Sequence, residues 1–280
     1  MLDLHSHSTA SDGTLTPSEL VELAERIGLT ALALTDHDTV AGLAEAERAA
    51  RGAAVELVPG VELSARDERG TLHIVGLYLD RENPELLAAL ERVREMRRER
   101  NPKMAEALER LGVPVSVEEA ARFAGGEVVG RPHFAAAMVE KGHVENTEQA
   151  YRRFLDRERP AHVPKQRLEP EECIRLIRGA GGLPVLAHPL QTKRRGAALE
   201  RLADELVEMG LGGIEVFCSG HTPPLTRELE LIARNRDLVR SGGSDFHGEV
   251  KPNIRLGRGP GSLYVPDDLL GPIRRAAGGD

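Results

Sequence analysis

The chain has 280 residues, of which 40% are hydrophobic, and carries a formal net charge of −8. This acidic balance argues against binding to long duplex nucleic acid, and no apolar run approaches the roughly 18 residues of a membrane span. The N-terminus lacks the basic and apolar regions of a signal peptide, and Cys173 and Cys218 suggest two buried thiols and no disulfide framework. We therefore expect a cytoplasmic protein without membrane association, and the sequence indicates no obligatory protein partner.

The N-terminal segment carries the first candidate site residues. A short apolar strand presents His5 and His7 one residue apart, so both imidazoles would point to the same face. Asp12 follows on a Ser11-Asp12-Gly13 turn and adds a carboxylate nearby. These residues indicate half of a metal site, although two surface histidines before a loop would explain this stretch alone equally well.

Helices and strands alternate over residues 16–79. A capping box formed by Thr16 and Glu19, with Pro17 at the first helical position, begins the first helix. The expected elements are a helix ending at Gly28, a strand at 31–34, a helix at 40–50, a strand region at 55–62 interrupted at Pro59 and Gly60, and a strand at 71–79. This alternation is typical of a parallel α/β sheet or barrel.

From Pro84 to about Arg159 the sequence pattern predicts helices and no strands. A long charged helix is expected to Arg100, where Asn101 and Pro102 should break or kink it. A capping box at 116–119, a stop at Gly125-Gly126 and helices at 132–140 and 147–155 follow. We interpret 84–163 as an inserted, substrate-selecting subdomain of a domain that comprises 1–83 and 164–280.

The alternation resumes after Pro164, and polar residues fall where its strands end. Helices at 171–179, 199–209 and 225–235 precede strands at 183–187, 213–217 and 238–241, and a last helix is expected at 267–276. The residues in or just after strands are His5, His7, Asp36, His37, Asp38, Glu62, His73, His188, Glu215, His221, Asp245 and His247. Because the strand ends of a parallel barrel converge on one rim, these residues can meet.

Their joint placement is stronger evidence than any one of them. A single histidine is more often a surface group, but seven of the ten histidines lie in or just after expected strands. Mixed imidazole and carboxylate ligands suit Mn, Fe or Zn better than Mg or Ca, and there are more of them than one ion needs. The pattern indicates two or three ions.

The motifs resemble those of the PHP (polymerase and histidinol phosphatase) metal-dependent phosphoesterases, in order and along nearly the whole chain. They are His5-Ser6-His7, Ser11-Asp12-Gly13, Thr35-Asp36-His37-Asp38, Pro59-Gly60-Val61-Glu62, Leu72-His73-Ile74-Val75-Gly76, Ala187-His188-Pro189 and Gly243-Ser244-Asp245-Phe246-His247. The resemblance implies an α/β fold, a distorted (β/α)7 barrel with a helical insertion, and a trinuclear metal site.

The resemblance also implies the ligands. His5, His7, Glu62 and Asp245 would hold one divalent ion, Glu62 would bridge to a second ion held by His73 and His188, and Asp12, His37 and His247 would hold the third. The ions would be Mn²⁺, with Fe²⁺ or Zn²⁺ as alternatives. We interpret Asp36, Asp38 and Glu215 as partners of the imidazoles or as turn caps.

The helical insertion, with Gly130-Arg131-Pro132-His133-Phe134-Ala135, resembles the branch of the family that acts on nucleoside 3',5'-bisphosphates and short RNA ends. This resemblance implies a nucleotide or short oligonucleotide substrate. The expected reaction is hydrolysis of the 3'-phosphate of such bisphosphates; the alternatives are a histidinol-phosphate phosphatase and a non-catalytic, metal-stabilised binding module. The candidate catalytic residues are Asp12, His37 and His221, with His221 as an acid. The candidate substrate-binding residues are Arg131, His133, Lys165, Ser219 and His221.

Overall fold

Seven strands form the centre of the protein. The computed structural model describes residues 1–124, 129–164, 167–261 and 263–278. The strands, paired in chain order, are β1 (Leu2–Asp3), β2 (Ala31–Leu34), β3 (Glu56–Ala65), β4 (Leu72–Leu77), β5 (Leu183–Leu186), β6 (Gly213–Cys218) and β7 (Val239–Gly243). The Leu4 N–H donates to Gly242 O, and Ser6 bridges Phe246, so the first strand meets the last and the sheet closes. The distorted (β/α)7 barrel is confirmed.

Strand β4 runs against its neighbours and corrects the expectation of an all-parallel sheet. It pairs antiparallel with both β3 and β5, whereas the other neighbouring strands are parallel. The physical reason is the short loop 66–71, because a parallel neighbour would need a crossover of about a dozen residues or more. His73 is the second residue of β4, and it therefore lies at the rim where the parallel strands end.

The interruption predicted within β3 is wrong. Pro59 lies opposite Leu34 in the parallel register, and its carbonyl accepts a hydrogen bond from the Leu79 N–H. At the next residue, a Cβ on Gly60 would lie 2.8 Å from the Gly76 carbonyl oxygen. Glycine at this position lets β3 run unbroken between β2 and β4.

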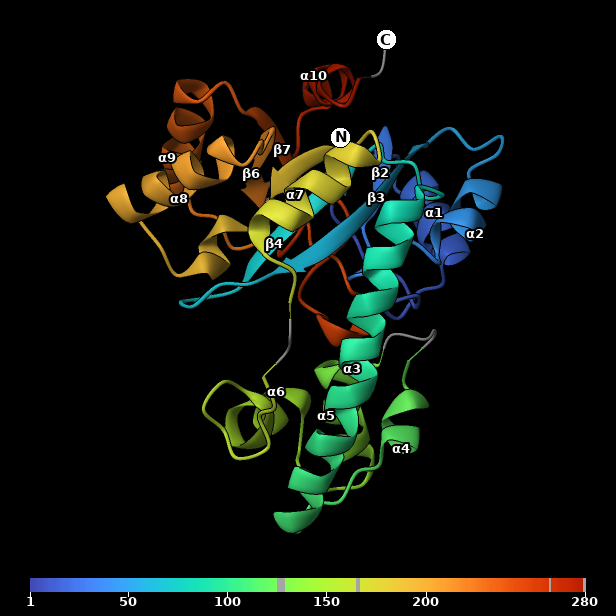
Figure 1. Cartoon of the computed structure of the whole chain (residues 1–280). Coiled ribbons are helices and arrows are strands. Elements are labelled where there is room, and N and C mark those ends of the chain that lie inside the picture. The colour runs from blue at the N-terminus through green and yellow to red at the C-terminus, as the bar shows by residue number, and fades with distance from the viewer. Residues whose placement is uncertain (125–128, 165–166, 262, 279–280) are drawn as a thin grey trace.

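Helices cover the barrel on the outside. They are α1 (Pro17–Arg26), α2 (Leu43–Ala49), α7 (Pro170–Gly179), α8 (Ala197–Glu208), α9 (Pro223–Asn235) and α10 (Leu270–Ala276), with short helical turns at Pro189–Thr192, Gly248–Val250 and Asp267–Leu269. The predicted capping box of Thr16 and Glu19 is present at α1. Inside the barrel, Leu2, Val58 and Val185 belong to an apolar core that includes Ile273 of α10, which lies at the end of the barrel away from the insertion (Figure 1).

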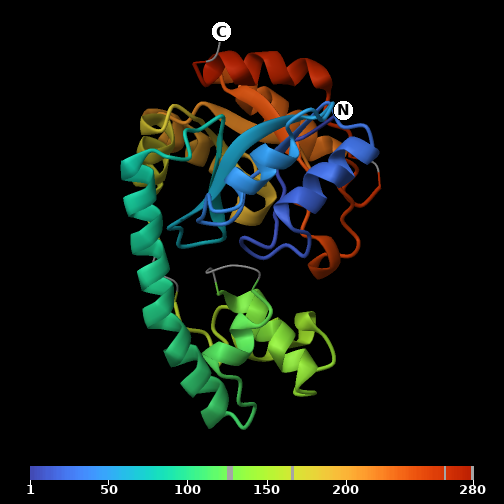
Figure 2. The same cartoon turned by 90° about the vertical axis from the view of Figure 1, so that its right-hand side faces the viewer.

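The insertion consists of helices below the barrel (Figures 1 and 2). They are α3 (Pro84–Arg110), α4 (Val117–Ala121), α5 (Arg131–Glu140) and α6 (Thr147–Ala150), which continues into a π-helical turn at Tyr151–Leu155. Leu86 and Val93 of α3 pack in the outer core of the barrel, while Met104 and Leu108 pack in a separate core with Phe134. One helix therefore joins the barrel to a group of helices that has its own apolar core.

Of the two outcomes predicted at Asn101 and Pro102, a break or a kink, the break is wrong, because α3 continues through both residues to Arg110. Proline removes one backbone donor, but the buried residues on either side, Val93 and Met104, anchor the helix in two cores. The predicted helix 147–155 changes to π-helical geometry after Ala150. The stop predicted at Gly125-Gly126 lies outside the described residues.

Two other predictions concern the described residues as a whole. None of their helices combines the length and the apolar character needed to cross a membrane. Cys173 and Cys218 are both buried and form no disulfide, as predicted.

Candidate metal centre

The N-terminal segment delivers two histidines into the barrel mouth. The His7 N–H donates to Phe246 O, and the Asp245 N–H donates to His5 O, so the segment after β1 is fixed to the segment after β7. Both imidazoles are fully buried, and their ring centroids are 5.2 Å apart. The chain therefore places His5, His7 and Asp245 together although 238 positions separate His7 from Asp245.

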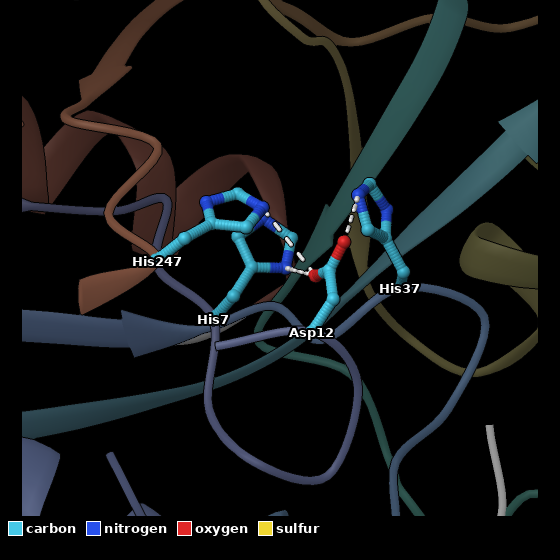
Figure 3. A group of neighbouring side chains, drawn as sticks. All are labelled: His7, Asp12, His37 and His247. Atoms are coloured by element: carbon cyan, nitrogen blue, oxygen red, sulfur yellow. Dashed lines mark ion pairs between the residues drawn. The ribbon is translucent and has the colours of Figure 1, made fainter. Parts of the chain in front are cut away.

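Nine side chains at this rim form what we call the His–carboxylate cluster. It consists of four overlapping groups whose ligand atoms lie within 4.8 Å of one another: His7, Asp12, His37 and His247; His5, His7 and Asp245; His5, Glu62 and His188; and His37, Glu62 and His73. Figure 3 shows the first group, in which Asp12 from the turn after β1 points at the three imidazoles. All nine residues predicted as ligands thus lie in one cluster.

Glu62 lies at the centre of the cluster. Its carboxylate oxygens are 2.7 Å from His37 Nδ1, His73 Nδ1 and His188 Nε2, and it is completely buried. Burial raises the pKa of this carboxyl, but the imidazoles of His37, His73 and His5 outweigh it and hold the pKa well below its usual value. Glu62 is therefore ionised and can serve more than one cation.

The cluster also fits metal ions because several of its buried ring nitrogens have no hydrogen-bond partner among the described residues. Among the described residues, His5 Nε2, both ring nitrogens of His7, His37 Nδ1, His188 Nδ1 and Glu62 Oε2 are buried without a hydrogen-bond partner. His37 Nδ1 and Glu62 Oε2 are only 2.7 Å apart, yet they make no hydrogen bond. Such unpaired buried groups cost free energy that bound cations would offset.

Carboxylates behind the cluster fix how the imidazoles point. Glu215 of β6 lies with Oε1 2.7 Å from His5 Nδ1, and its other oxygen accepts the His188 backbone N–H. With Nδ1–H donating to Glu215, His5 keeps the lone pair of Nε2 toward the cluster. His247 is oriented in the same way, because its Nδ1 lies 2.9 Å from the Asp245 carbonyl oxygen.

The two aspartates that flank His37, Asp36 and Asp38, accept hydrogen bonds from backbone N–H groups. Asp36 accepts hydrogen bonds from the Ser8 N–H and from the hydroxyl of Ser11, and so fixes the turn that carries Asp12. Asp38 accepts the Ser64 N–H, and it pairs with Arg97 of α3. These contacts agree with the alternative that Asp36 and Asp38 are turn caps, whereas Glu215 is the partner of an imidazole, that of His5.

Replacing Glu215 with glutamine is expected to lower the affinity for Mn²⁺ by about 10- to 100-fold, the usual effect of losing a partner behind a ligand. A glutamine side chain has only one acceptor oxygen and no negative charge. It therefore cannot accept hydrogen bonds from both the His5 ring N–H and the His188 backbone N–H, as the two oxygens of Glu215 do. Isothermal titration of the metal-free protein with Mn²⁺ measures this change. Unchanged affinity would mean that Glu215 does not orient His5.

A cavity of about 230 Å³, the inner pocket, connects the cluster to the insertion. Asp12, His37 and His73 line it together with four arginines, Arg97, Arg100, Arg131 and Arg167. Arg97 and Arg100 come from α3, Arg131 begins α5, and Arg167 follows the insertion. The inner pocket therefore has imidazoles and a carboxylate toward the barrel and guanidinium groups toward the insertion.

Three of these arginines have no carboxylate partner among the described residues. Arg100 donates to the side-chain oxygen of Asn101 at 2.8 Å, Arg131 donates to the Leu155 carbonyl at 3.3 Å, and Arg167 Nε has no partner. Burial and then the charges of Arg97 and Arg131 lower the pKa of Arg100 to about 9. Uncompensated guanidinium groups of this kind are suited to binding a phosphate.

The other predicted substrate residues lie elsewhere or have other partners. The His133 ring accepts the Gly130 N–H at 3.0 Å and caps α5, while the Ser219 hydroxyl donates to the Ser244 carbonyl. His221 lies 2.9 Å from the Val216 carbonyl through Nδ1, and it lines a different cavity with Tyr264. Burial lowers the pKa of His221, which does not favour a role as an acid. Lys165 lies outside the described residues.

Sequence reasoning missed several residues that support the centre. Lys251 Nζ lies 2.7 Å from Asp245 Oδ2, and Asp3 accepts hydrogen bonds from the N–H and the hydroxyl of Ser244. Arg97, Arg100 and Arg167 were also not identified. A lysine six positions after a candidate ligand and a polar residue in an apolar strand were the available signals.

A closed α/β barrel with a buried His–carboxylate cluster at its mouth defines the class as a metal-dependent hydrolase. A family model, the PHP domain, matches residues 3–123. A 5'-3' exoribonuclease of Haemophilus influenzae is 40% identical over 88% of this chain and 89% of its own, and a 3',5'-nucleoside bisphosphate phosphatase of Chromobacterium violaceum is 38% identical over 88% and 87%. The chain belongs to the PHP family, and it is a metal-dependent phosphoesterase.

A solved structure agrees with this assignment over the whole fold. An amidohydrolase from Chromobacterium violaceum, determined with bound sulfate and no metal, matches with a TM-score of 0.88 at 36% identity and covers 99% of this chain and 95% of its own. The similarity therefore includes the helical insertion as well as the barrel.

Proposed function

We propose that this phosphoesterase hydrolyses the 3'-phosphate of nucleoside 3',5'-bisphosphates and acts on short 5'-phosphorylated RNA. One observation carries the proposal: the inner pocket is lined by residues of the His–carboxylate cluster and by three arginines that have no carboxylate partner among the described residues. A substrate with two phosphates matches both ends, the 3'-phosphate at the cluster and the 5'-phosphate at the arginines. The names of two relatives, a bisphosphate phosphatase and a 5'-3' exoribonuclease, support this choice.

We propose that the cluster holds three divalent ions, most suitably Mn²⁺, on the ligand sets implied by the family resemblance. The overlap of the four groups at His5, His7, His37 and Glu62 supports shared ligands between neighbouring ions. When bound, the ions would neutralise phosphate oxygens and lower the pKa of a coordinated water. Asp12 and His37 face both the cluster and the inner pocket, which supports their role at the reacting phosphate.

We further propose that the insertion, residues 84–163, selects the substrate and that 1–83 with 164–280 form the catalytic domain. Arg97, Arg100 and Arg131 reach the inner pocket from α3 and α5, and no other described helix supplies an arginine to it. The guanidinium fork of Arg131 would bind the 5'-phosphate. The cytoplasmic location and the absence of an obligatory partner stay predictions.

Histidinol phosphate fits this site less well. Its protonated amine would face the arginines of the inner pocket and be repelled by them, whereas a second phosphate would be attracted. The non-catalytic binding module is also disfavoured, because the similar relatives carry the names of enzymes.

Phosphate release from a substrate panel tests the proposal. Metal-free protein given Mn²⁺ is offered adenosine 3',5'-bisphosphate, histidinol phosphate and a 5'-phosphorylated trinucleotide RNA. We expect the highest kcat/KM for the bisphosphate, turnover of the RNA and little release from histidinol phosphate. Preference for histidinol phosphate would refute the proposal.

Protein purified without chelator is expected to contain more than one transition-metal ion per chain, because the four groups offer more ligands than one ion uses. Elemental analysis by inductively coupled plasma mass spectrometry measures the ratio. A ratio of one or less with Mn²⁺ in excess would contradict the trinuclear centre. Chelation should also lower the melting temperature, since bound ions stabilise the folded state.

A further inference from the structure

A second cavity, the outer pocket, lies next to the inner pocket and measures about 630 Å³. Thr71, Arg131 and Arg167 line both cavities, so the two adjoin at these side chains. Asp12 and His37 line only the inner pocket. The outer pocket is therefore adjacent to the proposed binding site of the 5'-phosphate and lies on its far side from the His–carboxylate cluster.

The outer pocket is strongly cationic in a chain whose net charge is negative. Its lining includes seven arginine and lysine side chains against three carboxylates. One of those carboxylates, Asp67, is neutralised by Arg194, whose two terminal nitrogens lie 3.0 and 2.7 Å from its two oxygens. Arg159 and Lys193, which both line the cavity, form no ion pair with any described residue. The cavity therefore carries uncompensated positive charge that can bind an anionic ligand.

The composition of the lining also favours an anionic group over a nucleobase as the occupant. The described lining residues include no phenylalanine, tyrosine or tryptophan, and no leucine, isoleucine, valine or methionine. Among these residues, a base would have only the imidazole of His162 and the guanidinium planes on which to stack. An anionic group needs only the charges that are present.

Hydrogen bonds fix the barrel side of the outer pocket. The Arg66 N–H donates to Leu168 O at 2.8 Å, and the Thr71 N–H donates to Gln191 O at 3.0 Å. Asp67 also accepts the N–H groups of Arg69 and Gly70. A Cβ on Gly70 would lie 2.5 Å from the Gln191 carbonyl oxygen, so the backbones are in direct contact. The loop is therefore held in place before any ligand binds.

We infer that the outer pocket binds the outer phosphates of a 5'-diphosphate or 5'-triphosphate, on a nucleoside 3'-phosphate or on an RNA 5' end. The inference rests on the proposed function, because it needs the first 5'-phosphate in the inner pocket. The reaction is unchanged: water attacks the 3'-phosphorus, the bond to O3' breaks, and inorganic phosphate and the nucleoside 5'-diphosphate leave. An RNA chain continuing from O3' lies on the cluster side and leaves the outer pocket free.

Steady-state kinetics with two substrates test the inference. Adenosine 3'-phosphate 5'-diphosphate and adenosine 3',5'-bisphosphate are compared on wild-type protein and on Arg159→Ala and Lys193→Ala, with Arg110→Ala of α3 as a control outside both pockets. We expect KM for the 5'-diphosphate to be no higher than for the bisphosphate in wild-type protein. Each pocket variant should raise only the KM for the 5'-diphosphate, by about three- to tenfold, and added salt should reduce the difference.

A second arm compares trinucleotide RNAs that carry a 5'-triphosphate or a 5'-monophosphate, and equal or faster turnover of the triphosphate would extend the inference to RNA ends. Hydrolysis of the bisphosphate with rejection of both polyphosphates would overturn the inference alone. Equal effects of the variants on both nucleotides would do the same. Failure of the bisphosphate itself would instead overturn the proposed function, and the inference with it.

Discussion

Replacing Asp245 with asparagine or His7 with alanine is expected to lower kcat by more than about a hundredfold, since losing a ligand should exceed the effect of losing a partner behind it. His7 and Asp245 share a group with His5, and His7 Nε2 lies 3.4 Å from Asp245 Oδ1. Phosphate release at saturating Mn²⁺ measures kcat, and circular dichroism checks the fold.

Two residues outside the His–carboxylate cluster, the half-buried His143 and the exposed Asp268, provide matched controls for these variants. His143→Ala removes an imidazole that lies in the insertion, and Asp268→Asn alters a carboxylate near α10. Both should keep wild-type kcat. If Asp245→Asn or His7→Ala retained near wild-type turnover with saturating metal, the assignment of that residue to the centre would be wrong.

Replacing Arg131 with alanine is expected to raise KM for adenosine 3',5'-bisphosphate by about 10- to 150-fold, which corresponds to the roughly 1.5–3 kcal/mol of one charge-assisted contact. The KM for adenosine 3'-monophosphate should change little, because that substrate has no 5'-phosphate. The physical reason is the position of Arg131 in the inner pocket without a carboxylate partner among the described residues. Initial rates over a range of both substrates measure the difference.

Arg152→Ala, an exposed arginine of the same insertion, is the control and should leave both KM values unchanged. Arg131→Lys should recover part of the loss, since lysine keeps the charge but not the fork. Equal losses on both substrates would place Arg131 at the cleaved phosphate. No loss on either would mean that it does not contact substrate.

The cluster could be predicted from sequence because its residues follow recognisable apolar runs. His37 follows the strand Ala31–Leu34, and His188 follows Leu183–Leu186, so the ends of the expected strands already indicated these members of the cluster. His73 was harder, because it lies at the start of β4 and reaches the same rim only through the antiparallel reversal. The strand pattern listed His73 only as a residue within a strand, and the family motifs then indicated its place among the expected ligands.

The arginine side of the inner pocket could not be predicted in the same way. Arg97 and Arg100 lie in a helix rich in charged residues, where sequence alone suggests a solvated surface. They are buried because α3 continues past Pro102 and carries the insertion under the barrel mouth. The π-helical turn Tyr151–Leu155, whose Leu155 carbonyl accepts a hydrogen bond from Arg131, likewise follows from tertiary packing.

The identity of the product tests the central claim most directly. Metal-free protein is supplied with Mn²⁺ and adenosine 3',5'-bisphosphate, and the nucleotide product is identified by chromatography against authentic standards. Binding of the 5'-phosphate by the arginines and cleavage at the cluster should yield adenosine 5'-monophosphate and one equivalent of phosphate. Formation of adenosine 3'-monophosphate, or no release of phosphate at all, would contradict the account.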